Sequence, residues 1–349
     1  MPTDHQVEPA GPAGKVLDRG VTAVAHPNIA LVKYWGKRDG QLMIPYVDSL
    51  SMTLDVFPTT TTVRLSPAAR ADSVTLDGSP AQGEPRQRVI AFLDLVREMA
   101  GRTEPAVVDT RNSVPTGAGL ASSASGFAAL ALAGAAAYGL DLDPTALSRL
   151  ARRGSVSASR SIFGGFAICH AGRGTGAAAD LGSYAEPVPV PDFDPALVVA
   201  VVNAGRKAVS SRAAMRRTVE TSPLYRSWAV SSRADLSEMR AALHRGDLDA
   251  VGEIAERNAL GMHATMLAAR PAVRYLSPAT VAVLDSVLQL RADGVPAYAT
   301  MDAGPNVKVL CHPADAARVA GTVRGAAPGC SVVTARRGPG ASLRAEAGQ

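Results

Sequence analysis

The amino-acid sequence predicts an α+β protein made of two halves. Segments rich in β-branched residues and segments with helical periodicity follow one another without the regular alternation of a doubly wound sheet. The length of 349 residues exceeds what one hydrophobic core usually organises. A proline-rich stretch, residues 186–195, lies near the middle. We therefore expect two domains, residues 20–190 and 191–338, between disordered tails at 1–19 and 339–349.

The first half is expected to open with an antiparallel sheet. Its β-branched residues concentrate in four short segments, residues 20–25, 52–57, 60–65 and 73–76. A helix is expected next, at residues 86–99. Its apolar residues recur at helical spacing, namely Val89, Phe92, Leu93, Val96 and Met99.

Three more elements complete the first half. A short strand is expected at residues 106–110, and a glycine-rich loop then leads into a helix of small residues at 121–138. Asp143 followed by Pro144 marks another helix start, because an N-cap aspartate and a proline at the first helical position favour initiation.

The second half is expected to begin with a buried strand at residues 197–202, an apolar run. Three helices and two strands should follow, at residues 222–242, 248–267, 280–293, 297–300 and 307–311. Strand, helices and strands in this order favour an α+β fold.

Composition excludes several classes of protein. Hydrophobic residues make up 47% and charged residues 19%, yet no apolar run is long enough to span a membrane. The N-terminus lacks the pattern of a signal peptide. Three separated cysteines favour neither disulfides nor a zinc site, which suits a reducing cytoplasm. The net charge of +5 suits a polyanionic small molecule and leaves a nucleic-acid-binding protein as an alternative of another class.

Two loops of small residues are candidate anion sites. The segment PTGAGLASSASG, residues 115–126, lies between a predicted strand and helix, where glycines and helix N–H groups can approach a phosphate. It is not a Walker A loop, and glycine content alone equally suits a flexible helix cap. The segment GSVSASRS, residues 154–161, surrounds Arg160 with hydroxyls, an arrangement suited to holding a carboxylate or phosphate.

Six segments, in order, resemble the mevalonate diphosphate decarboxylase family of the GHMP kinase superfamily. Three carry most of the likeness: HPNIALVKYWGKR at residues 26–38, the serine-rich loop at 115–126, and MDAGPN at 301–306. The other three are residues 157–160, 209–212 and 258–263. The resemblance spans roughly residues 20 to 310, and six segments in family order are far more specific than any one of them.

The resemblance implies a GHMP-kinase fold. Its N-terminal half would resemble the second domain of ribosomal protein S5, its C-terminal half would be ferredoxin-like, and the active site would lie in the cleft between them. The implied enzyme is cytoplasmic and homodimeric. It uses ATP and Mg²⁺ to phosphorylate the 3-hydroxyl of mevalonate 5-diphosphate, and then releases phosphate and CO2 to give isopentenyl diphosphate and ADP.

The resemblance also implies catalytic roles for four residues. Asp302 would orient or deprotonate the hydroxyl and stabilise positive charge on the branched carbon. Arg160 and Asn28 would hold the substrate carboxylate, and Lys37 would neutralise phosphate charge. An Asx turn at Asp302 and a solvated lysine pair at Lys33 and Lys37 are the structural alternatives.

The resemblance implies further binding residues. Substrate contacts would come from Tyr34, Lys33, Ser155, Ser157, Arg160, Ser211 and Arg212. Nucleotide contacts would come from Thr110, Asn112, Gly117, Gly119, Leu120, Ala121, Ser122 and Ser123, with Ser122 also a candidate Mg²⁺ ligand. His263, in a segment similar to the family, is expected to be structural.

Two related enzymes remain as alternatives: a GHMP kinase that does not decarboxylate, and a decarboxylase acting on mevalonate 5-phosphate. Relatives that only phosphorylate tend to lack the pair kept here as Asp302 and Lys37, which favours decarboxylation. The third alternative, a basic protein with an S5-like domain, would bind RNA in a salt-sensitive manner and ignore ATP. No membrane or nucleic-acid partner is expected.

Overall fold

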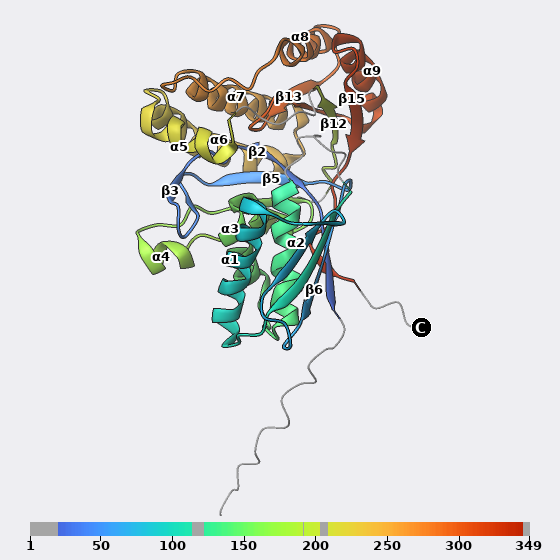
Figure 1. Ribbon diagram of the computed structural model, residues 1–349. Coiled ribbons are helices and arrows are strands. Elements are labelled where there is room, and N and C mark those ends of the chain that lie inside the picture. The colour runs from blue at the N-terminus through green and yellow to red at the C-terminus, as the bar shows by residue number, and fades with distance from the viewer. Residues whose placement is uncertain (1–19, 114–121, 191, 203–208, 345–349) are drawn as a thin grey trace, which may run out of the picture.

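The computed structural model describes residues 20–113, 122–190, 192–202 and 209–344 (Figure 1). The predicted tail at residues 1–19 and the last residues, 345–349, lie outside this part of the chain. No helix in the described ranges is long and apolar enough to cross a membrane.

A six-stranded sheet forms the base of the first half. Its strands run in the order β16-β1-β6-β9-β7-β8, and every neighbouring pair is antiparallel except β7 and β9, which are parallel. Their bounds are β16 (Ser342–Leu343), β1 (Val21–Ala25), β6 (Thr59–Leu65), β9 (Ala106–Asn112), β7 (Ser73–Leu76) and β8 (Ser79–Pro80). The expectation of antiparallel pairing is therefore wrong for the pair β7 and β9 and right for the other pairs.

Helices cover one face of this sheet and enclose a core with it. They are α1 (Gly83–Ala100), α2 (Ser122–Ala137), α3 (Pro144–Gly154) and the 3-10 helix η1 (Val156–Ile162). The small side chains of α2 let it pack against β1 and β6. The predicted start of α3 is confirmed, because the Asp143 side chain accepts a hydrogen bond from the Ala146 N–H and Pro144 occupies the first position.

A second sheet lies between the two halves of the chain (Figure 1). It has the order β11-β10-β5-β2 and is antiparallel throughout. Its strands are β11 (Ala185–Val188), β10 (Phe166–Cys169), β5 (Ser49–Thr53) and β2 (Asn28–Val32). One hydrophobic cluster joins β2 and β5 to helices of the second half, so the halves share a core. The hairpin β3 (Lys37–Asp39) and β4 (Ile44–Pro45) and the short helix α4 (Gly176–Leu181) flank this sheet.

The second half is built on an antiparallel sheet with the order β13-β14-β12-β15. Its strands are β13 (Ala297–Met301), β14 (Val307–Cys311), β12 (Ala196–Val201) and β15 (Ser331–Ala335). Along β12, Leu197 and Val199 face the shared core, while Val198 and Ala200 face α8 and α9. Both faces of the sheet are buried, which explains the continuous apolar run of β12.

Six helical segments complete the second half: α5 (Ser211–Thr221), α6 (Tyr225–Arg245), α7 (Leu248–Leu267), α8 (Pro278–Ala292), η2 (Pro313–Asp315) and α9 (Ala316–Ala326). The prediction for α7 is confirmed at both ends. The predicted helix at residues 222–242 is displaced by three residues, and α5, α9 and β15 were not predicted.

The predicted disordered tail from residue 339 is wrong for residues 339–344. β16 adds to the edge of β1, the Gly338 N–H donates to the Thr53 carbonyl over 2.8 Å, and the Ala341 N–H donates to the Ile162 carbonyl over 3.2 Å. A Cβ on Gly338 would lie 1.9 Å from the Leu54 carbonyl oxygen. Glycine is required here because the chain passes so close to another backbone, and does not indicate disorder.

Candidate active site

Asp302 lies at the junction of the two halves, directly after β13. Its Oδ1 is 2.9 Å from the Nζ of Lys33, which directly follows β2, and its Oδ2 is 3.0 Å from the Nζ of Lys308, on β14. Lys33 Nζ also donates to the Ala30 carbonyl over 2.7 Å. Each carboxylate oxygen thus pairs with one ammonium group.

The three charged groups alter one another's ionisation. Burial lowers the pKa of Lys33 to about 8, although the Asp302 charge opposes this shift. Burial alone would raise the pKa of Asp302, but the charges of Lys308 and Lys33 outweigh it and hold that pKa far below its usual range. The Asp302 side chain keeps 31% of its surface exposed, so an ionised carboxylate is open to a bound molecule.

Helix α7 holds the backbone of both Lys33 and Asp302 through side-chain hydrogen bonds. Asn258 Oδ1 accepts a hydrogen bond from the Lys33 N–H over 2.8 Å, and Asn258 Nδ2 donates to Asp235 Oδ2 over 2.7 Å. His263 Nε2 lies 3.2 Å from the Asp302 carbonyl. Burial lowers the pKa of His263 to about 4, so its ring is neutral at pH 7 and donates from Nε2. The expectation of a structural His263 fits this contact.

Arg160 occupies a second buried position, beside strands β2 and β5. Its side chain is 2% exposed, its Nε donates to Ser51 Oγ over 2.9 Å, and an Nη donates to Ser49 Oγ over 2.7 Å. Within the described ranges no acidic side chain pairs with it, and burial lowers its pKa. An unpaired buried guanidinium favours an anionic ligand.

Asn28 bonds to the 3-10 helix η1, which carries Arg160. Its Nδ2 donates to the Ser157 carbonyl over 2.9 Å and to Ser161 Oγ over 2.7 Å, while its Oδ1 lies 3.3 Å from Arg160 Nε. At the start of η1, Ser155 Oγ and Ser157 Oγ lie 3.1 Å apart. The predicted group of Asn28, Arg160 and these serines is thus brought together, with Asn28 bonded to protein groups.

Lys37, Arg88 and Arg212 form a separate cationic cluster from β3, α1 and α5, in which an Arg212 Nη lies 3.5 Å from the Glu84 carboxylate. Burial lowers the pKa of Lys37 to about 8, and the charges of Arg212 and Arg88 lower it further. Arg88 lies 4.8 Å above the Phe127 ring, and its buried Nε has no hydrogen-bond partner in the part of the chain that the structure describes. Its pKa is lowered to about 10, chiefly by burial. No sequence motif marks Arg88, which lies in an ordinary amphipathic helix.

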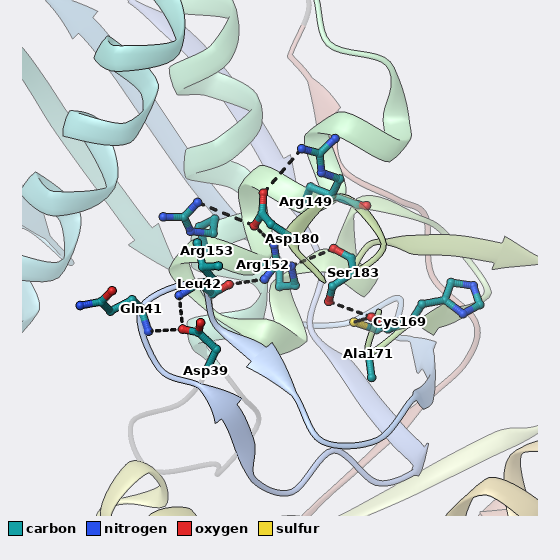
Figure 2. Close-up of polar contacts among 12 residues, drawn as sticks. Asp39, Gln41, Leu42, Arg149, Arg152, Arg153, Cys169, Ala171, Asp180 and Ser183 are labelled. Atoms are coloured by element: carbon teal, nitrogen blue, oxygen red, sulfur yellow. Dashed lines mark hydrogen bonds and ion pairs between the residues drawn. The ribbon is translucent and has the colours of Figure 1, made fainter. Parts of the chain in front are cut away.

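Arginines from α3 and β3 hold the hairpin that begins with Lys37, and Figure 2 shows the contact from Arg152 of α3 to Leu42. The fully buried Arg152 donates to the Leu42 carbonyl in the hairpin, to the Ser183 carbonyl over 2.9 Å, and to Asp180. From the hairpin, Arg38 donates to the Ala171 carbonyl over 2.9 Å. Lys37 therefore stands on a braced element.

Tyr34 and Ser211 are the other predicted substrate residues. Tyr34 packs with Met43, Val156 and Cys169, and burial raises the pKa of its phenol. Ser211 begins α5, next to Arg212 and one residue after the Ser210 N-cap.

The predicted nucleotide residues are only partly described. Gly117, Gly119, Leu120 and Ala121 lie outside the described residues, and the Ser122 side chain is not described. Ser123 lies in the first turn of α2.

Thr110 and Asn112 are engaged within the protein. Thr110 Oγ1 lies 3.0 Å from Thr61 Oγ1, and Asn112 Oδ1 accepts from Thr59 Oγ1 over 2.9 Å. Among the described residues no group of three or more His, Cys, Asp or Glu could hold a metal ion.

The buried Arg160 and the cluster of Lys37, Arg88 and Arg212 lie in a two-part fold with the exposed Asp302 carboxylate. Together they are typical of an enzyme site for a multiply charged anion. Two family models match the chain: the diphosphomevalonate decarboxylase-like N-terminal domain over residues 25–182, and the mevalonate 5-diphosphate decarboxylase C-terminal domain over residues 197–339. The chain belongs to the mevalonate diphosphate decarboxylase family, which confirms the resemblance and, at the level of a mixed two-domain protein, the predicted fold class.

Solved structures agree with the family models. The mevalonate diphosphate decarboxylase from Enterococcus faecalis is 43% identical, with a TM-score of 0.87 over 93% of this chain and 98% of that chain. A structure of MDDEF in complex with MVAPP, AMPPCP and magnesium is 44% identical, with a TM-score of 0.88 over the same shares.

Curated relatives carry two names. A phosphomevalonate decarboxylase from Haloferax volcanii is 35% identical over 82% of this chain and 87% of its own length. A diphosphomevalonate decarboxylase from Ganoderma lucidum is 36% identical over 82% of this chain and 77% of its own length.

Proposed function

We propose that this protein is the ATP-dependent decarboxylase that converts mevalonate 5-diphosphate to isopentenyl diphosphate, ADP, phosphate and CO2. The observation that carries the proposal is the Asp302 carboxylate, open to a ligand and set between Lys33 from one half and Lys308 from the other. Membership of the family and the solved relative with MVAPP, AMPPCP and magnesium support it.

The chemistry explains why such a carboxylate is needed. A tertiary hydroxyl leaves poorly, and ATP with Mg²⁺ supplies the phosphoryl group that turns it into a stable leaving anion. Loss of that anion gives the branched carbon cationic character, which the ionised Asp302 stabilises. Because its pKa is held so low, Asp302 is a weak base. It acts mainly by orienting the hydroxyl and by electrostatic stabilisation.

Arg160 holds the carboxylate that departs as CO2. The guanidinium is buried among Ser49, Ser51 and Asn28 without an acidic partner in the described structure, which suits a substrate carboxylate. Asn28 orients the guanidinium from the other side. These partners of Arg160 are neutral, so they add no second positive charge where the substrate carboxylate binds.

The cationic cluster of Lys37, Arg88 and Arg212 binds the 5-diphosphate. Two phosphates carry about three negative charges, which match three cations. Tyr34, Lys33, Ser155, Ser157 and Ser211 complete the substrate site, and Lys37 also neutralises charge during phosphoryl transfer.

The start of α2 and the loop before it bind the nucleotide phosphates through Gly117, Gly119, Leu120, Ala121, Ser122 and Ser123. Mg²⁺ is usually held by phosphate oxygens and few protein ligands, so a single hydroxyl such as Ser122 suffices on the protein side. Thr110 and Asn112 shape the adenine end.

The proposal extends to the fold of each half, the cleft between them and the oligomeric state. Residues 20–190 form an S5-like domain and residues 191–338 a ferredoxin-like domain, with the substrate in the cleft between them. The position of Asp302 and Lys33 on different halves supports this cleft. The enzyme is a cytoplasmic homodimer; its three cysteines are free thiols, as is usual in a reducing compartment.

The test is to supply purified protein, ATP and Mg²⁺ with either mevalonate 5-diphosphate or mevalonate 5-phosphate, and to measure ADP and CO2 together. We expect equal amounts of both products, with kcat/KM at least about tenfold higher for the diphosphate. The Haloferax volcanii relative favours the monophosphate as the second candidate. ADP without CO2 would instead make the protein a kinase.

A further inference from the structure

Lys308 is a buried charge in an otherwise apolar strand. Its side chain is 2% exposed, and its neighbours along β14 are Val307 and Val309. These valines face α8 and α9, whereas Leu310, two residues after Lys308, belongs to the shared core on the opposite face. Strand alternation therefore directs Lys308 toward the junction of the two halves.

Burying an ammonium is costly unless a specific partner compensates it. The partner here is Asp302 Oδ2, 3.0 Å away. Lys33 already pairs with Oδ1 at 2.9 Å, and one cation is enough to balance one carboxylate. Lys308 therefore adds something beyond charge balance.

What Lys308 adds is a second fixed point on the carboxylate. The charged and titratable groups that face Asp302 are Lys33 after β2, Lys308 on β14, His263 on α7 and, at longer range, Arg160 on η1. His263 reaches only the Asp302 backbone carbonyl. Without Lys308, the carboxylate could rotate about its single remaining contact with Lys33.

We propose that Lys308 is a positioning residue that holds Asp302 Oδ2, so that the carboxylate keeps one orientation and its negative charge while substrate binds. This inference rests on the proposed function of the site. Lys308 is also the larger of the two attractive charges that lower the pKa of Asp302. A merely structural lysine would contribute to folding and leave the ionisation of Asp302 untouched.

The test uses Lys308→Met, which removes donor and charge at similar volume, and Lys308→Gln, which keeps a donor without charge. The carboxyl carbon of Asp302 is followed by ¹³C NMR during a pH titration, assigned by its loss in Asp302→Asn. In the wild type we expect an ionised signal down to the lowest pH at which the protein stays folded. In both folded variants the signal should begin to protonate within the pH range over which the wild-type signal stays ionised.

Kinetics give the second readout. We expect Lys308→Met to lower kcat at least about tenfold with KM for ATP within about twofold, and Lys308→Gln to fall between it and the wild type. Arg291→Met is the matched control, because Arg291 also pairs with a carboxylate in the second half, Glu256, at 2.8 Å. It should lower the melting temperature without changing the Asp302 titration.

An Asp302 signal that stays ionised over the same pH range in folded Lys308→Met and Lys308→Gln overturns the proposal. So does an unchanged kcat in Lys308→Met. The NMR titration needs no turnover, so failure of the wild type to release CO2 would refute the proposed function while leaving the positioning contact open to this test.

Discussion

At the scale of single residues, Lys33 and Lys37 make the site sensitive to pH. Burial lowers the pKa of Lys33 and of Lys37 to about 8. An ammonium is charged below its pKa and neutral above it. Both side chains therefore lose the charge needed for substrate binding as pH rises through about 8.

We predict that kcat/KM for mevalonate 5-diphosphate falls above about pH 8, with a limiting slope approaching two on a logarithmic plot. Lys37→Arg should reduce that slope toward one, because arginine stays charged throughout this range. Rate measurements across pH with ATP at saturation check this. A level profile up to about pH 10, or equal slopes in both proteins, would contradict the assignment.

Arg160 provides a second prediction at this scale. Arg160→Ala should lower kcat/KM for the substrate by about two to three orders of magnitude while ATP affinity, measured by calorimetry, is kept. Arg160→Lys keeps the charge but loses the planar fork, so its rate should lie between the two. If Arg160→Ala weakened only ATP binding, the substrate carboxylate would not be its ligand.

The site residues differ in how far the sequence could reveal them. Asp302, Lys33, Arg160 and Asn28 stand in segments that resemble the family, and the structure brings them to the junction of the halves. Lys308 lies outside all six segments that resemble the family. It stands in an apolar strand, where a single charged residue follows no recognisable pattern. Only the packing of β14 beside β13 places it against Asp302.

At the scale of elements, the β3–β4 hairpin is the part whose placement depends most on single side chains. Lys37 is its first residue, and Arg152 reaches it from α3 through the Leu42 carbonyl. Among the residues that the structure describes, strands β3 and β4 pair only with each other, so side chains must anchor the hairpin to the rest of the fold.

We predict that Arg152→Met destabilises the protein by about 3–5 kcal/mol, because it removes a fully buried cation and leaves Asp180 and two carbonyls without that donor. KM for the substrate should also rise, since Lys37 loses its support. Arg149→Met is the control: its Nη lies 3.6 Å from Asp180 and is more exposed, so it should cost less than about 1 kcal/mol. Urea unfolding measures the free energy of unfolding of both variants. An equal loss of stability in the two would contradict the role of Arg152 in anchoring the hairpin.

Elements with strong periodicity could be predicted from the sequence, whereas elements that depend on distant packing could not. α1 and α7 carry apolar residues at regular helical spacing, and each was placed correctly to within a few residues. α9 and β15 lie near the C-terminus and depend on packing against α8 and β12 for their stability. β16 depends wholly on pairing with β1, more than three hundred residues earlier, which no local pattern can indicate.

At the scale of the whole molecule, the two halves share one hydrophobic core. The cluster contains Leu50 and Met52 of the first half together with Met239 and Val251 of the second. Asn258 adds a direct hydrogen bond from α7 to the Lys33 backbone. Separating the halves would expose this apolar surface and dismantle the site.

We therefore predict a single cooperative unfolding transition, in which the calorimetric and van't Hoff enthalpies agree. Residues 20–190 expressed alone should aggregate or stay partly unfolded. Two resolved transitions in the intact chain, or a stable isolated first half, would show that the shared core contributes little.

The proposed reaction depends most on one aspartate, Asp302, at the junction of the two halves. The direct measurement is the release of CO2 and ADP by Asp302→Asn, a nearly isosteric change that removes only the charge, with mevalonate 5-diphosphate, ATP and Mg²⁺. We predict that kcat falls by at least about three orders of magnitude while ATP affinity changes less than about twofold. A folded Asp302→Asn that releases both products at close to the wild-type rate would contradict the account.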